Sequence, residues 1–174
     1  MIKELAKKIK DASYLEGDFI LRSGKRSKYY LDKYLFETKY DILDQLTDAF
    51  KLKIEKNYPK FDILAAPELG AVAIVSLLSV KLKKNFVIIR KEQKDYGTAK
   101  QTEGSLEGVK SALLIEDILT TGGAALQSAK ILRESGIDVI AIMGTIDRLQ
   151  GGQAEIEKAG FKYDALLTVK DLGI

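Results

Sequence analysis

Apolar residues recur along the chain with two different spacings. In some segments they fall three or four positions apart or dominate a long stretch, which predicts helices. These segments are residues 2–14, 39–57, 70–83, 122–135 and 152–159. Between them lie short, continuous apolar runs, which are typical of strands buried on both faces of a sheet. These runs are residues 62–66, 86–89, 111–115, 139–143 and 163–167.

The alternation of strands with helices predicts an α/β fold in which residues 1-174 form a single domain. The continuous apolar strands indicate a mostly parallel central sheet flanked by helices. Residues 18–35 hold two short strand-like stretches around a turn at residues 23–25, which predicts a hairpin. In such folds ligands gather beyond the carboxyl ends of the strands, so functional residues are expected there.

The amino-acid composition limits which reactive groups and metals the protein can use. The chain has no cysteine, no histidine and a formal net charge of +3. Disulfide and thiolate chemistry is therefore excluded, and a reducing cytoplasm is the expected compartment. Without histidine, a metal would need oxygen ligands, which favours Mg²⁺ or Mn²⁺. The small net charge and the lack of a membrane-length apolar run or a signal peptide predict no nucleic-acid or membrane partner.

The strongest motif follows the strand at residues 111–115. Glu116 and Asp117 come first, and residues 120–123, Thr-Thr-Gly-Gly, then lead into a helix. Backbone N–H groups and hydroxyls at a helix N-terminus suit a phosphate, whereas carboxylates suit the hydroxyls of a sugar. The segment therefore predicts a sugar phosphate site. The alternative is an ordinary strand–turn–helix in which a threonine caps the helix.

Residues 91–108 form a long polar segment without periodicity, and such segments are often functional lids. Arg90, Lys91 and Lys94 stand at its beginning. Cations on a lid could neutralise a leaving group such as pyrophosphate. A solvated charged loop is the alternative.

Arg148 follows the strand at residues 139–143. An arginine at the carboxyl end of a strand can grip a carboxylate with two parallel hydrogen bonds. A structural pair between Asp147 and Arg148, or a solvated arginine, is the alternative.

The order Glu-Asp, two apolar residues, Thr-Thr-Gly-Gly-Ala resembles the signature of type I phosphoribosyltransferases, which bind 5-phosphoribosyl-1-pyrophosphate (PRPP). The resemblance implies that Glu116 and Asp117 hold the ribose hydroxyls and take part in catalysis. It also implies that the loop wraps the 5′-phosphate. The loop residues expected to contact PRPP are Ile118, Leu119, Thr120, Thr121, Gly122, Gly123 and Ala124.

Residues 90–97, Arg-Lys-Glu-x-Lys-Asp-x-Gly, resemble the catalytic loop of orotate phosphoribosyltransferases. The resemblance implies that Arg90, Lys91 and Lys94 contact PRPP at its pyrophosphate, with Lys94 as the catalytic general acid. In the family the loop reaches into the neighbouring subunit's site, which implies a homodimer that shares residues 91–104. Tyr96 stands where the family usually has histidine. A tyrosine still donates a hydrogen bond to PRPP but cannot become cationic.

Three further strings resemble the same family. Residues 146–152 match Ile-Asp-Arg-x-x-Gly-Gly, in which the arginine, here Arg148, binds orotate. Residues 19–30 match a hood segment, and residues 66–71 match a short pyrophosphate loop. The hood match implicates Arg22 in binding PRPP and places Tyr30 and Leu31 against the base, and the loop match implicates Leu69 and Gly70 in binding PRPP. Thr120 of the PRPP loop is also expected to contact orotate.

The resemblance implies transfer of the phosphoribosyl group of PRPP to orotate, which gives orotidine 5′-monophosphate and pyrophosphate in UMP biosynthesis. Mg²⁺ is expected to arrive on the pyrophosphate, without direct side-chain ligation. One alternative is a purine phosphoribosyltransferase, against which Arg148 argues because purines lack the carboxylate. The other is a PRPP-sensing regulator without catalysis, although residues 1–17 are too short for a helix-turn-helix.

Overall fold

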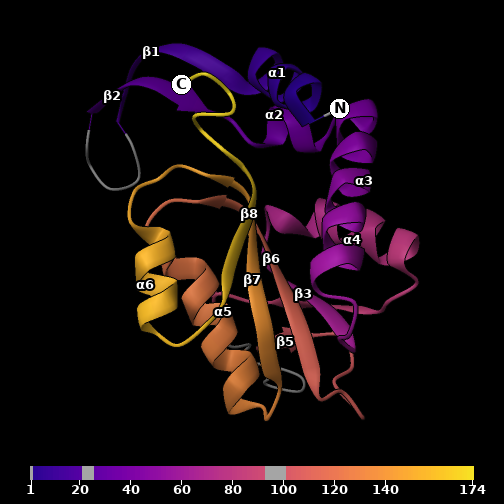
Figure 1. Cartoon of the computed structure of the whole chain (residues 1–174). Coiled ribbons are helices and arrows are strands. Elements are labelled where there is room, and N and C mark those ends of the chain that lie inside the picture. Colours follow the sequence, from indigo (N-terminus) through magenta and orange to yellow (C-terminus); the bar gives the residue numbers. More distant parts are fainter. Residues whose placement is uncertain (1, 21–25, 93–100) are drawn as a thin grey trace.

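A six-stranded sheet forms the centre of the protein (Figure 1). The computed structural model describes residues 2–20, 26–92 and 101–174. Within them the strand order is β5-β4-β3-β6-β7-β8, and only β5 runs antiparallel to its neighbour. The strands are β3 (Ile63–Pro67), β4 (Phe86–Ile89), β5 (Thr102–Glu103), β6 (Ser111–Leu119), β7 (Asp138–Asp147) and β8 (Tyr163–Thr168).

Helices cover both faces of this sheet, α3 (Tyr40–Asn57) and α4 (Ala71–Leu82) on one, α5 (Gly123–Glu134) and α6 (Gly152–Lys158) on the other (Figure 1). Successive strand residues therefore enter different cores. Leu113 packs in the core that includes α3 and α4, whereas Leu114 packs in the core under α5. Because both faces are buried, every position of such a strand must be apolar, which explains the continuous runs.

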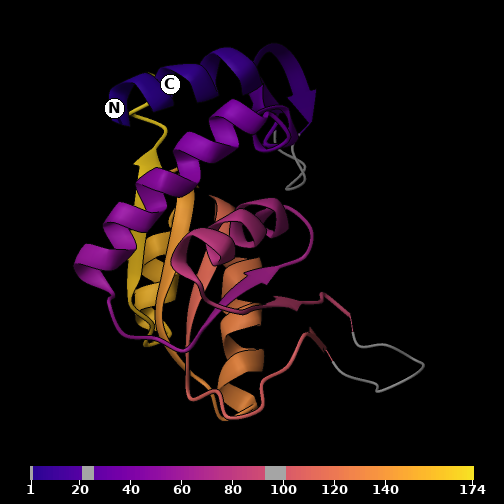
Figure 2. The same ribbon diagram turned by 90° about the vertical axis from the view of Figure 1, so that its right-hand side faces the viewer.

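A smaller unit, the hood, lies beyond one end of the sheet (Figures 1 and 2). It consists of α1 (Ile2–Ser13), β1 (Tyr14–Ile20), β2 (Arg26–Leu31) and α2 (Tyr34–Glu37). The strands β1 and β2 form an antiparallel hairpin, as predicted. The apolar stripe of α1, Leu5, Ala6 and Ile9, is buried in the core that α3 also lines.

The predicted fold class is confirmed, with three differences in detail. Strands β6 and β7 continue beyond the apolar runs and stay paired as far as Leu119 and Asp147. An apolar run ends at its first charged residue, but the backbone ladder does not. The short strand β5 and the one-turn helix α2 have no apolar periodicity and were not predicted. The predicted turn at residues 23–25 lies outside the described residues.

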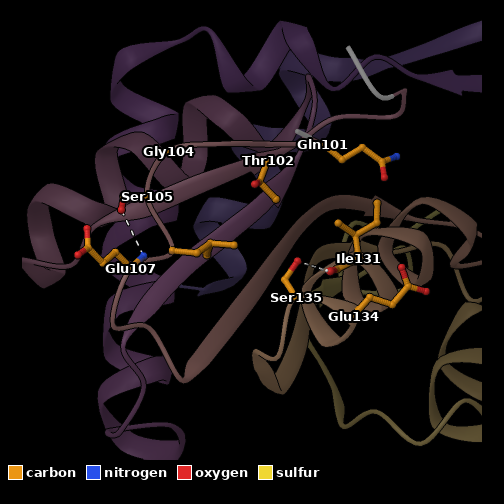
Figure 3. Close-up of a pocket in the computed structure, with 9 residues that line it drawn as sticks. Gln101, Thr102, Gly104, Ser105, Glu107, Ile131, Glu134 and Ser135 are labelled. Carbon is orange, nitrogen blue, oxygen red and sulfur yellow. Dashed lines mark hydrogen bonds between the residues drawn. The ribbon is translucent and has the colours of Figure 1, made fainter. Parts of the chain in front are cut away.

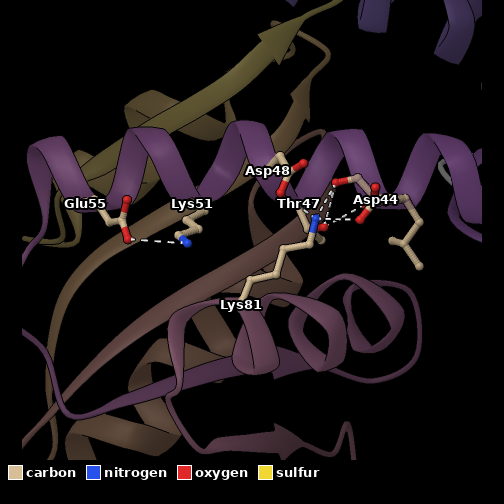
Figure 4. A network of polar contacts seen from close by, with 7 residues as sticks. Asp44, Thr47, Asp48, Lys51, Glu55 and Lys81 are labelled. Carbon is tan, nitrogen blue, oxygen red and sulfur yellow. Dashed lines mark hydrogen bonds and ion pairs between the residues drawn. The ribbon is translucent and has the colours of Figure 1, made fainter.

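Polar contacts join α3 to α4 on the surface (Figure 4). Lys81 Nζ lies 2.7 Å from Asp44 Oδ1 and 2.6 Å from Asp48 Oδ1. Such exposed pairs contribute little stability, and the buried side chains of Leu46, Phe50 and Leu78 supply most of it. Within the described parts of the chain, no helix has both the length and the apolar character needed to cross a membrane.

Candidate active site

A cavity of about 220 Å³ opens at the carboxyl ends of β3 and β6. It is lined by the acids of β6, the loop that enters α5, the loop between β3 and α4, and two hood residues. Most of the residues expected to bind PRPP are among those lining it: Leu69, Gly70, Lys91, Glu116, Asp117, Ile118, Leu119, Thr120, Gly122, Gly123 and Ala124. Thr121 is exposed and is not in this lining.

Asp117 lines the cavity and contacts residues from two other segments of its wall, Lys33 and Gly70. It is 4% exposed, and its Oδ2 accepts a hydrogen bond from Lys33 Nζ of the hood. Gly70, at the N-terminus of α4, approaches the same carboxylate so closely that a Cβ there would overlap it. Glycine at position 70 is therefore what allows the β3–α4 loop to lie directly against Asp117.

Glu116 is the second buried acid of β6 and lies beside Asp117 in the sequence. Burial, and then the neighbouring charge of Asp117, raise the pKa of Glu116 well above its usual range. The sequence suggested that both acids follow the strand at residues 111–115. In the structure they lie within β6, which extends to Leu119. A raised pKa favours the protonated form of Glu116, which can donate a hydrogen bond as well as accept one.

Glu37, at the end of α2, is a third acid near the cavity. It is 1% exposed, and neither of its carboxyl oxygens has a hydrogen-bond partner among the described residues. Burial, and then repulsion by Asp117, raise the pKa of Glu37 to about 9, although Lys33 opposes the shift. Sequence reasoning missed both Lys33 and Glu37. The available signal was a charged residue directly after Leu35 and Phe36.

The raised pKa of Glu37 predicts how stability depends on pH. The unfolded chain ionises this group near its ordinary pKa of 4.5, whereas the folded protein retains the proton up to about 9. The contribution of Glu37 to stability is therefore full below pH 4.5 and is lost as pH rises toward 9. Denaturant unfolding of Glu37→Gln should lack this loss, so the stability of the variant relative to wild type should rise by about 1.4 kcal/mol per pH unit between pH 4.5 and 8. Parallel pH profiles of the two proteins would contradict this.

The phosphate loop and the loop that carries Arg148 lie side by side. The Arg148 N–H donates to the Leu119 carbonyl at 2.9 Å, and the Gly152 N–H donates to the Thr120 carbonyl at 3.0 Å. A Cβ on Gly152 would come within 2.6 Å of that carbonyl, so glycine is needed for the approach. Gly122 caps α5 with φ of 81°, a conformation that favours glycine.

Arg148 does not pair with Asp147, so that structural alternative is not observed. Asp147 instead accepts hydrogen bonds from the Leu149 N–H at 2.7 Å and the Tyr163 hydroxyl at 3.0 Å. The Arg148 guanidinium lies 5.1 Å from the centre of the Tyr29 ring. Its buried Nε has no hydrogen-bond partner within the described ranges. Arg148 is outside the lining of the cavity but joins it through Leu119.

The two hood residues expected to contact the orotate base, Tyr30 and Leu31, differ in their exposure to solvent. Leu31 is buried in the core, and Tyr30 is exposed with its ring 5.6 Å from that of Phe19. Their neighbour Tyr29 is the residue that lies against Arg148. Alternation along β2 explains this, since Tyr29 and Tyr30 point to opposite faces of the hairpin.

The first residues of the expected lid are held in place beside the cavity. The Lys91 N–H donates to Glu68 Oε1 at 2.9 Å, and Gln127 of α5 donates to the Lys91 carbonyl at 3.3 Å. Arg90 is half-buried and pairs with Glu103 at 3.4 Å instead of lining the cavity. Three of the expected site residues, Arg22, Lys94 and Tyr96, lie outside the described residues.

A second cavity, of about 630 Å³, lies between the segment after β5 and helix α5 (Figure 3). It contains none of the residues expected in the site. Its charged lining residues are the acids Glu107 and Glu134, so it does not suit a phosphate.

Comparisons with known proteins agree with this geometry. The family model described as "Phosphoribosyl transferase domain" matches residues 38–168. The orotate phosphoribosyltransferase of Pyrococcus abyssi is 42% identical over 173 residues, which cover 99% of this chain and 95% of that protein. That of Methanopyrus kandleri is 41% identical over 90% of this chain and 82% of the relative.

Solved structures share the fold. The Mycobacterium tuberculosis orotate phosphoribosyltransferase in complex with PRPP superposes with a TM-score of 0.80 at 22% identity, covering 99% of each chain. Leishmania donovani UMP synthase gives a TM-score of 0.84 at 27% identity, covering 98% of this chain and 37% of that one. With the sequence relatives above, these findings show that the chain belongs to the orotate phosphoribosyltransferase family.

Proposed function

We propose that the protein transfers the phosphoribosyl group of PRPP to orotate, producing orotidine 5′-monophosphate and pyrophosphate for UMP biosynthesis. One observation carries the proposal above the others. The acid pair of β6, the N-terminus of α5 and the β3–α4 loop converge on one cavity. These three elements supply partners for sugar hydroxyls, for a phosphate and for a pyrophosphate, respectively.

PRPP fits this arrangement in one orientation. Its 5′-phosphate would lie at the N-terminus of α5, where Thr120, Gly122 and Gly123 present backbone N–H groups and a hydroxyl. Its ribose hydroxyls would meet Glu116 and Asp117. Its pyrophosphate would then lie toward Leu69 and Gly70, across the cavity.

The reaction needs no side-chain nucleophile. A ring nitrogen of orotate forms a bond to C1 of the ribose while the bond from C1 to the pyrophosphate oxygen breaks. The proton of that nitrogen is released to water, and the bonding electrons leave with the pyrophosphate. Positive charge develops on the ribose, and the Asp117 carboxylate stabilises it. Glu116, whose raised pKa favours the protonated form, would hold a hydroxyl by donating or accepting a hydrogen bond.

The leaving pyrophosphate would be neutralised by Arg90, Lys91 and Lys94, with Lys94 as general acid and Tyr96 as a hydrogen-bond donor. The described residues contain no cluster of three acids that could cage a metal. Mg²⁺ in proteins is often held by one carboxylate together with substrate phosphate oxygens and water. The carboxylate that faces this cavity fits a metal ion that arrives bound to pyrophosphate. Bound in that way, Mg²⁺ supplies positive charge on the leaving group.

The lid implies a homodimer in which residues 91–104 serve the partner's site. Helix α4 supports the homodimer, because its outer side is also apolar: Val80 there is 72% exposed. Such a surface suits contact with a second copy. The absence of cysteine supports action in the cytoplasm.

The base is proposed to be orotate because no carboxylate among the described residues pairs with Arg148, which lies beside the phosphate loop. Thr120 of that loop is the other expected contact. A mixture of orotate, adenine, hypoxanthine and uracil, incubated with PRPP and Mg²⁺, tests the assignment. Chromatography should detect orotidine 5′-monophosphate alone. A purine nucleotide as the main product would refute the base assignment while leaving PRPP binding intact.

A further inference from the structure

Lys33 lines the cavity but has no role in the chemistry described so far. It precedes α2 in the hood, and its side chain is 30% exposed. Its ammonium reaches across the cavity to Asp117 Oδ2. A Cβ on Gly70 would come within 2.5 Å of the same nitrogen. The cation therefore lies between the acid expected for the ribose and the loop expected for the pyrophosphate.

In this position Lys33 competes with a ribose for Asp117. A carboxylate oxygen that accepts a hydrogen bond from an ammonium is less available to a sugar hydroxyl. A donor that binds must therefore displace Lys33 from Asp117. The ammonium then needs another anionic partner, because an unpaired cation in a largely buried site is costly.

Two partners are within the same region. Glu37 is one, but burial and the charge of Asp117 raise its pKa to about 9, which disfavours the ionised form that an ammonium would need. The pyrophosphate of PRPP is the other, since it would lie against Leu69 and Gly70, where Lys33 Nζ already is. Its higher negative charge makes it the stronger partner for an ammonium.

We propose that Lys33 is a pyrophosphate-binding residue that leaves Asp117 for the pyrophosphate when PRPP binds. The inference rests on the proposed function and adds a selection step to it. Asp117 is freed for the ribose hydroxyls at low cost only if the ligand carries a pyrophosphate to receive Lys33. A ribose 5-phosphate without pyrophosphate has to displace the lysine without offering it a new partner. The site thereby favours PRPP over sugar phosphates that lack a pyrophosphate.

Calorimetric titration of Lys33→Met with two probes tests the proposal, namely PRPP with Mg²⁺ and ribose 5-phosphate. Loss of one charge-assisted contact should weaken PRPP binding by at least about tenfold. Ribose 5-phosphate should bind the variant as tightly as wild type or more tightly, because its competitor for Asp117 is gone. Lys33→Gln, which keeps a polar side chain, should behave in the same way.

Lys53→Met is the matched control. Lys53 is 27% exposed and pairs with Asp164 at 2.7 Å, outside the cavity lining, so this variant should bind both ligands as wild type does. Unchanged PRPP affinity in both Lys33 variants would overturn the inference. Equal weakening of both ligands would also overturn it, since Lys33 would then only hold Asp117 in place. Failure of the wild-type protein to bind PRPP would instead overturn the proposed function.

Discussion

Replacing Asp117 by asparagine is expected to lower kcat/KM for PRPP by about 10²–10³-fold, the range found when a group that stabilises transition-state charge is removed. The substitution keeps the shape of the side chain and removes its charge. The Asp117 carboxylate is buried, accepts a hydrogen bond from Lys33 and lies directly against the backbone of Gly70. A water molecule therefore cannot enter the site and replace the lost charge. Steady-state rates of orotate consumption at varied PRPP measure the loss.

Asp164→Asn provides the matched control for this prediction. Asp164 is a partly buried acid that also pairs with a lysine, Lys53, but it lies outside the cavity. Its replacement should leave kcat/KM within about twofold of wild type, since surface changes away from the site act weakly. Equal losses in the two variants would show that the effect of Asp117→Asn comes from general destabilisation and not from the reaction.

Replacing Arg148 by leucine is expected to lower kcat/KM for orotate by about 10²-fold or more, because a bidentate contact with the orotate carboxylate would be lost. The KM for PRPP should change little, since the guanidinium lies outside the PRPP cavity. Arg148→Lys should recover only part of the activity, because an ammonium cannot form two parallel hydrogen bonds. Initial rates at varied orotate, with PRPP saturating, separate the two KM values.

Arg133→Leu is the control for Arg148. The Arg133 guanidinium also lies over an aromatic ring, 3.8 Å from the centre of Phe161, but in the last turn of α5, whose first residues line the cavity. This variant should keep wild-type kinetics. An Arg148→Leu enzyme with an unchanged KM for orotate would remove Arg148 from the base site.

Much of the fold followed from sequence because both faces of the sheet are buried. Residues 111–115 could only be a strand between two apolar layers, and the structure places Leu113 and Leu114 in different cores. The phosphate loop was equally visible, since its chemistry is concentrated in neighbouring positions of one segment. Local patterns of this kind do not depend on distant parts of the chain.

The contacts that sequence could not predict all join distant segments. Lys33 and Asp117 are 84 positions apart, and no spacing rule connects an N-terminal lysine with an acid in β6. The raised pKa of Glu116 likewise depends on its burial and on Asp117 together. Tyr29, rather than Tyr30, lies against Arg148 because the register of the hairpin decides which tyrosine faces the sheet.

The most direct test of the central claim is the absorbance of orotate followed over time with the purified wild-type protein, PRPP and Mg²⁺. The account predicts a steady loss of orotate that requires PRPP and Mg²⁺ and yields one equivalent each of orotidine 5′-monophosphate and pyrophosphate. Unchanged orotate, in a protein that consumes PRPP with another base or binds PRPP without turnover, would contradict it.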